Sequence, residues 1–230
     1  MHREIQTFLL IIFRKPKIVI AIFSFILLPG VFLHEVSHWL TAIFLRVRVI
    51  KFSLVPETSK NGQLRLGFVQ TQKCDPLRDS LIGLAPFVFG IMVIAWIGSS
   101  QLALRPVVEA LFAGDAAKIG DSLFISMGQA DYWIWLYLAF SISSTMVPSP
   151  SDRQSWIPIL IGVIVIFIGL LLVGLDDLIF LRFTPILEEW LRLIALVLAG
   201  STIIHLTILL PTWFARKIIS RLTGTQLVRV

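Results

Sequence analysis

The residues most able to do chemistry form one short run, His34-Glu35-Val36-Ser37-His38. On a helix, side chains four residues apart lie on one face, one turn above the other, so the imidazoles of His34 and His38 can bind one metal ion together. A zinc ion lowers the pKa of a bound water to about 7, and the adjacent Glu35 carboxylate can take the proton of that water. The run therefore predicts a hydrolytic site with one Zn²⁺ per chain and Glu35 as the catalytic base.

A hydrolytic zinc ion needs a third protein ligand and one open position. Asp152 is the best candidate, because it follows Pro148 and Pro150, which break a helix, and irregular backbone at membrane depth is tolerated where it lines a polar cavity. An ordinary surface turn is the alternative for this segment. His205 is a weaker candidate, since a lone histidine on an apolar helix is more often a packing residue. Three other acids are expected on the opposite side of the membrane, too far from the motif: Asp131, Asp176 and Asp177.

The composition indicates that membrane helices position these residues. The chain has 230 residues, of which 57% are hydrophobic and 15% charged, and its mean hydropathy is +0.88. Soluble domains are about 45–50% apolar and about 25% charged, so the composition argues against a soluble globular chain and more strongly against a disordered one. The single cysteine, Cys74, excludes an internal disulfide and a zinc site built from cysteines. The net charge of +6 is spread over loops between apolar runs, which favours membrane orientation over nucleic-acid binding.

The predicted fold is an all-α polytopic membrane protein with about five transmembrane helices. Residues 1–17 are interpreted as an amphipathic segment on the membrane surface. Residues 18–210 form the transmembrane core, and Pro29–Gly30 should kink or unwind its first helix. Residues 211–230 form a basic cytoplasmic tail. The expected spans are 18–45, 81–104, 132–148, 156–175 and 190–210.

The charges of the loops predict the orientation. Residues 46–80 are rich in Lys and Arg, whereas 105–131 and 176–189 carry more acids than bases. The positive-inside rule therefore puts 46–80, 149–155 and the C-terminus in the cytoplasm. Five spans then leave the N-terminus outside, although four basic residues favour the inside: Arg3, Arg14, Lys15 and Lys17. The expected location is a cell membrane, with the site toward its cytoplasmic side.

The 46–80 loop contains a hairpin signal. Two β-prone apolar runs flank Lys60-Asn61-Gly62, and Asn-Gly between such runs is typical of a tight turn. A small cytoplasmic β-hairpin is therefore expected between the first and second spans. Its edge strand could hold an unwound substrate segment by strand addition.

Taken together, these motifs resemble the site-2 protease family of intramembrane zinc metalloproteases, peptidase family M50, in a compact form without a PDZ domain. The run His34–His38 with Ala42 four residues on is similar to the family's first motif, HExxHxxxA. The hairpin loop, the Ala85-Pro86 segment and the proline-rich run that ends in Asp152 resemble its later features. The resemblance implies that His34, His38 and Asp152 bind zinc and that Glu35 is the catalytic base.

The sequence thus predicts an intramembrane zinc endopeptidase that hydrolyses peptide bonds in or near transmembrane segments. Its partners would be transmembrane protein substrates and the lipid bilayer, and no nucleic acid. A non-catalytic membrane protein that binds or chaperones helices, with a degenerate metal site, is the alternative. A transporter with a buried metal site is a third reading, but the sequence has no repeated halves.

Overall fold

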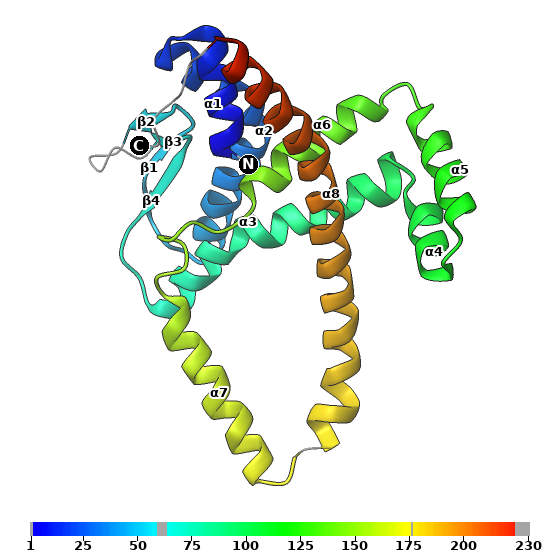
Figure 1. Ribbon diagram of the computed structural model, residues 1–230. Coiled ribbons are helices and arrows are strands. Elements are labelled where there is room, and N and C mark those ends of the chain that lie inside the picture. The colour runs from blue at the N-terminus through cyan, green and yellow to red at the C-terminus, as the bar shows by residue number, and fades with distance from the viewer. Residues whose placement is uncertain (1, 59–63, 176, 224–230) are drawn as a thin grey trace.

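The computed structural model describes residues 2–58, 64–175 and 177–223, and its described part is mostly helical with a small antiparallel sheet (Figure 1). This confirms the predicted helical class. The helices are α1 (His2–Phe13), α2 (Pro16–Phe44), α3 (Pro76–Trp96), α4 (Arg105–Ala113), α5 (Ala116–Met127), α6 (Tyr132–Thr145), α7 (Trp156–Leu172) and α8 (Thr184–Thr223). Two π-helical turns, Ile97–Gln101 and Leu178–Phe183, follow α3 and precede α8.

All five predicted apolar runs are helical, but they differ in length. Within the described residues, three helices are long and apolar enough to cross a membrane: Pro16–Phe44, Pro76–Gln101 and Phe180–Ile219. Helix α6 has 14 residues and α7 has 17, whereas about 20 are needed to span 30 Å of hydrocarbon. The chain is thus a membrane protein by the length and composition of three helices, and five crossings are not established.

Two segments differ from the expected loops and tail. Residues 105–131 hold the helices α4 and α5, which Figure 1 shows side by side and away from the sheet. Helix α8 has 40 residues and continues through Pro211 to Thr223, so much of the expected basic tail is helical. Apolar residues such as Trp213 and Phe214 extend the helical pattern beyond the proline, which explains the continuation. Residues 224–230 lie outside the described part of the chain.

The predicted hairpin loop forms two short strand pairs beside α2. Strand β1 (Val49–Ser53) pairs antiparallel with β4 (Phe68–Thr71), with Phe52 opposite Val69. Within the same loop, β2 (Glu57–Thr58) pairs antiparallel with β3 (Leu64–Arg65). The expected Lys60-Asn61-Gly62 turn lies outside the described residues.

Helix α2 packs on α6 at the point where its sequence carries Pro29-Gly30. The helix runs through both residues rather than unwinding. The Gly30 N–H donates to Ser141 Oγ at 2.9 Å, and the Tyr137 hydroxyl donates to the Ile26 carbonyl at 2.9 Å. A Cβ at Gly30 would overlap the Ser141 carbonyl, so only glycine allows α6 to lie this close. This contact fixes α6, and with it the segment that follows, against the helix that carries His34.

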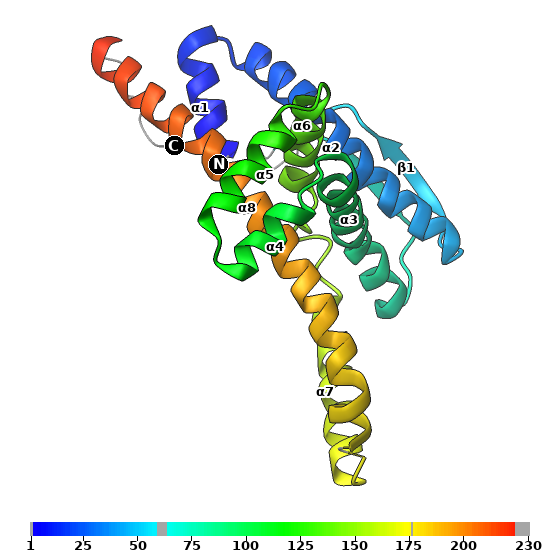
Figure 2. The same cartoon turned by 90° about the vertical axis from the view of Figure 1, so that its right-hand side faces the viewer.

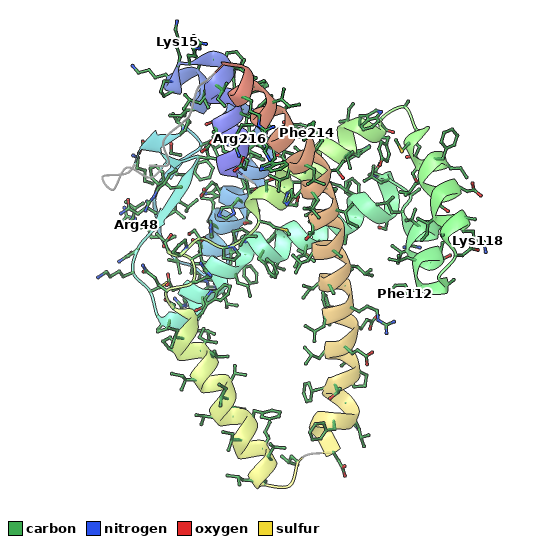
Figure 3. The ribbon with its side chains drawn as sticks, viewed as in Figure 1. Lys15, Arg48, Phe112, Lys118, Phe214 and Arg216 are labelled. Carbon is green, nitrogen blue, oxygen red and sulfur yellow. The ribbon has the colours of Figure 1, made fainter. Side chains whose placement is uncertain are left out.

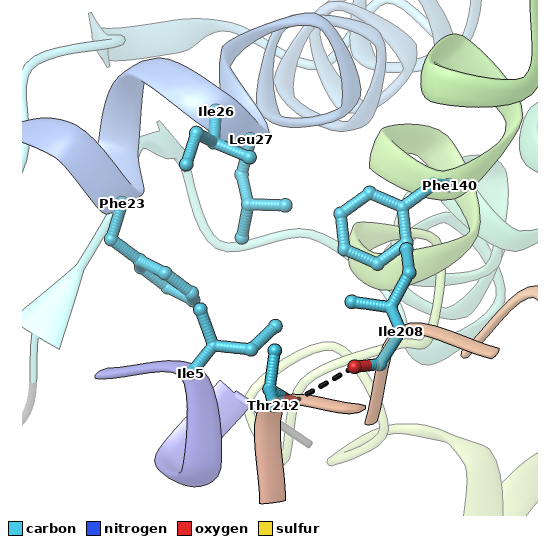
Figure 4. Close-up of a pocket in the computed structure, with 7 residues that line it drawn as sticks. All are labelled: Ile5, Phe23, Ile26, Leu27, Phe140, Ile208 and Thr212. Atoms are coloured by element: carbon cyan, nitrogen blue, oxygen red, sulfur yellow. Dashed lines mark hydrogen bonds between the residues drawn. The ribbon is translucent and has the colours of Figure 1, made fainter. Parts of the chain in front are cut away.

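Helix α1 packs against the C-terminal part of α8. Arg216, labelled beside α1 in Figure 3, places its Nε 2.7 Å from a carboxylate oxygen of Glu4. Helices α1, α2, α6 and α8 line an apolar pocket of about 130 Å³ between Ile5, Phe23, Phe140 and Ile208 (Figure 4). The amphipathic segment therefore packs on the helical bundle. By contrast, α7 and the N-terminal half of α8 extend beyond the other helices (Figure 2).

Candidate metal centre

Two histidine nitrogens face each other at the centre of the candidate site. The Nε2 atoms of His34 and His38 are 3.2 Å apart, and their rings are nearly perpendicular, at 82°. A tetrahedral zinc ion about 2.0–2.1 Å from each nitrogen would hold two such atoms about 3.3 Å apart. The spacing predicted from the helical repeat therefore gives a pair of donors that fits this ion.

Asp152 completes a group of three donors. Its Oδ1 lies 3.6 Å from His38 Nε2 and its Oδ2 lies 4.0 Å from His34 Nε2. One ligand atom from each residue lies within 4.8 Å of the others, which could hold a metal ion. The structure thus brings together the three residues that the sequence singled out, although more than a hundred positions separate Asp152 from the histidines.

The turn that carries Asp152 orients its carboxylate. The Ser149 N–H donates to Asp152 Oδ2 at 2.7 Å, and the Asp152 N–H donates to the Ser149 carbonyl at 3.1 Å. The segment begins after α6 ends at Thr145, where Pro148 and Pro150 prevent the helix from continuing. The side chain of Asp152 is only 16% exposed. The turn is exposed at Pro150 and Ser151, but its Asp152 side chain lies against the two histidines.

His38 is held by a backbone atom of α3. Its Nδ1 lies 2.7 Å from the buried carbonyl of Ile82, and a carbonyl can only accept, so Nδ1 donates. In the neutral imidazole, the Nε2 of His38 is then unprotonated, and it faces His34. This is the tautomer that binds a metal ion, and the backbone partner is the kind that fixes metal-ligating histidines.

Glu35 lies beneath the hairpin loop. It is 6% exposed, and a Cβ at Gly67 would lie 2.9 Å from its Cγ. Glu35 lines the same pocket as the three donors, which has a volume of about 1060 Å³. The pocket is enclosed by α2, the first turns of α3, the strands β3 and β4, and the segment from Ser144 to Asp152. A buried carboxylate beside a donor set can move a proton at that site.

The remaining sequence candidates lie elsewhere. His205 Nε2 is 3.1 Å from Ser143 Oγ and 3.2 Å from Ser144 Oγ, which makes it a hydrogen-bonded residue between α6 and α8. Asp131 accepts from Trp135 Nε1 at 2.7 Å, and Asp177 is exposed near the start of α8. Asp176 lies outside the described residues.

Sequence reasoning missed three residues that position the site: Gly67, Ile82 and Gly83. The first contacts Glu35, the second accepts from His38, and the third lies against the backbone of Asp152. Two are glycines and one acts through its carbonyl, so none has a side chain that signals chemistry. The Ala85-Pro86 segment was the only sign in the sequence that this part of α3 is unusual.

Comparison with family models, with curated proteins and with solved structures gives no match for this chain.

Proposed function

We propose that this protein is an intramembrane zinc endopeptidase that cleaves peptide bonds in or near transmembrane segments. Two imidazoles and a carboxylate within 4.8 Å of one another, with Glu35 lining the same pocket, are the observation that supports this function best. Two nitrogen donors and one oxygen donor, with room for water, are the ligand set of hydrolytic zinc sites. The proposed ion would be held by His34, His38 and Asp152.

Bound zinc would polarise a peptide carbonyl and lower the pKa of a water molecule to about 7. Glu35 would accept a proton from water in the pocket and deliver it to the leaving amide nitrogen. Its burial against Gly67 holds the carboxylate in place for both transfers. Ser144 and Thr145 line the pocket beside the donor group and give water a polar wall along α6.

The substrate would be an extended segment of a membrane protein, because the carbonyls of a helix are hydrogen-bonded and shielded. The pocket volume of about 1060 Å³ and its two-sided lining by strands and helices suit a peptide rather than a small solute. The three long apolar helices support a location in a lipid bilayer. We further propose that the site faces the cytoplasmic side, where the basic 46–80 loop belongs by its charge.

The decisive experiment combines metal analysis with one isosteric change. The purified full chain should contain about one zinc, measured by elemental analysis, and should cleave a co-reconstituted single-span reporter protein. Glu35→Gln should keep the zinc and abolish cleavage, because the carboxylate acts on the proton and is not a ligand. A folded wild-type chain without zinc would refute the proposal. Bound zinc without any cleavage by the wild type would instead favour a non-catalytic binding protein.

A further inference from the structure

The carbonyl of Ile82 is available to His38 because of a proline one turn further along α3. In a regular helix each carbonyl accepts from the N–H four residues later. The residue four positions after Ile82 is Pro86, which has no N–H and lies inside α3. The Ile82 carbonyl therefore has no helical donor at that position, and it accepts from His38 Nδ1 at 2.7 Å.

The burial of Ile82 and Pro86 makes the hydrogen-bond donor of the Ile82 carbonyl important. Ile82 is 6% exposed, and the side chain of Pro86 is among the largest fully buried ones of the described residues. A buried carbonyl without a donor is unfavourable, so the imidazole and the carbonyl each satisfy the other. The same bond decides which nitrogen of His38 carries the proton. With Nδ1 as the donor, Nε2 is left to face His34 and Asp152.

Two other prolines lie inside helices, and neither is placed in this way. Pro29 in α2 removes the helical donor of the carbonyl of Phe25, a residue that is 75% exposed. Pro211 in α8 removes that of Thr207, which is exposed. Among the described helices, Pro86 is thus the interior proline whose released carbonyl bonds a candidate metal ligand.

We propose that Pro86 is a positioning residue of the metal centre. Because Pro86 has no N–H, the Ile82 carbonyl is free to accept from His38 Nδ1. This hydrogen bond sets the tautomer and the ring orientation of His38. The inference rests on the metal binding in the proposed function and not on proteolysis. It predicts that restoring an N–H at position 86 weakens metal binding even where every ligand is present.

The test compares Pro86→Ala with Pro86→lactic acid in the purified full chain. Both replacement residues carry a methyl side chain. Alanine has a backbone N–H, whereas lactic acid joins the chain through an ester bond and has none. Zinc affinity, measured by competition with a chromophoric chelator, should fall about 10–100-fold with alanine, the loss typical when the group that orients a metal-binding histidine is changed. It should return to within about threefold of wild type with lactic acid, because the donor is again missing. Pro29→Ala should leave the affinity unchanged.

A second readout follows the tautomer directly in metal-free protein. The ¹⁵N chemical shifts of His38 should indicate Nδ1–H in the wild type and a mixture in Pro86→Ala. If the alanine variant does not fold, Gly83→glycolic acid provides the test, since it converts the Ile82 carbonyl to a weaker ester acceptor and should also lower zinc affinity. Equal zinc affinities of the alanine and lactic acid variants, or an unchanged affinity with glycolic acid, would overturn the role of Pro86. A wild type without zinc would instead count against the proposed function.

Discussion

Gly83 of α3 lies directly against the backbone carbonyl of Asp152, and a methyl group at position 83 would overlap that oxygen. The preceding residue, Ile82, accepts from His38. One turn of α3 therefore touches both the helix that carries the histidines and the turn that carries the carboxylate. Since neither contact uses a side chain of α3, the arrangement depends on how closely the backbones approach.

Gly83→Ala should lower zinc affinity by at least about tenfold, because the added methyl group must push the Asp152 turn away from the histidines. Chelator competition on the purified variant measures the effect. Gly169→Ala is the matched control, as Gly169 lies in α7 with no heavy atom within 4 Å of an added Cβ. That control should bind zinc as the wild type does. An unaltered affinity in Gly83→Ala would show that the turn can move without cost to the ligand group.

Asp152→Ala should abolish cleavage and should reduce zinc affinity more than the loss of a residue that only orients a ligand, which costs about 10–100-fold. The reason is that it removes the one oxygen donor of the group. His205→Ala should leave the metal in place, because His205 bonds the hydroxyls of α6 instead. Zinc content after dialysis distinguishes the variants. The ligand set is wrong if His205→Ala strips the metal and Asp152→Ala retains it.

Gly67→Ala should separate catalysis from metal binding. The new methyl group would lie 2.9 Å from Glu35 Cγ and 3.1 Å from the Ser53 carbonyl, so the carboxylate must shift. A displacement of about 1 Å can cost about 100-fold in rate, and a loss of that order in kcat is expected with zinc unchanged. Reporter cleavage and elemental analysis on the same preparation test both parts. Loss of zinc together with activity would mean that the hairpin supports the ligands rather than the base.

The reactivity of Cys74 should depend on pH in a defined direction. Burial raises the pKa of the Cys74 thiol, and the nearby carboxylates of Asp79 and Asp75 raise it further. Because the thiolate is the reactive form, alkylation should be slow near pH 7 and should accelerate only above the ordinary range of a thiol. Asp79→Asn removes a negative charge and should move the rate profile to lower pH. A profile that does not move on this substitution would contradict the electrostatic cause.

The same cysteine tests the orientation of the hairpin loop. A membrane-impermeant thiol reagent, applied at high pH, should leave Cys74 unlabelled in intact cells and should label it in inside-out vesicles, because the basic 46–80 loop is expected in the cytoplasm. Since Cys74 is the single cysteine of the chain, no background thiol has to be removed. Labelling from outside intact cells would reverse the proposed orientation.

Much of the helical architecture follows from the sequence. Apolar runs of sufficient length mark α2, α3 and α8, and alternating apolar residues on both sides of the sequence Lys60-Asn61-Gly62 mark the strands β1 and β4. Helices α4 and α5 were expected as a loop, because their apolar residues are interleaved with charges and small residues. Helix α8 extends beyond the expected span 190–210, because Pro211 favours a helix end in the sequence although the helix continues to Thr223.

The sequence by itself determined the pairing of His34 with His38, because the helical repeat puts residues four apart on one face wherever the helix lies. It also singled out Asp152, through the prolines that end α6. Only the tertiary structure decided that Asp152 reaches the histidines and that the Ile82 carbonyl orients His38. Those contacts use backbone carbonyl oxygens, and they depend on the close approach that Gly67 and Gly83 allow because they have no side chain. Every residue has a backbone carbonyl, so its use at a site becomes visible only when packing brings a particular donor to it.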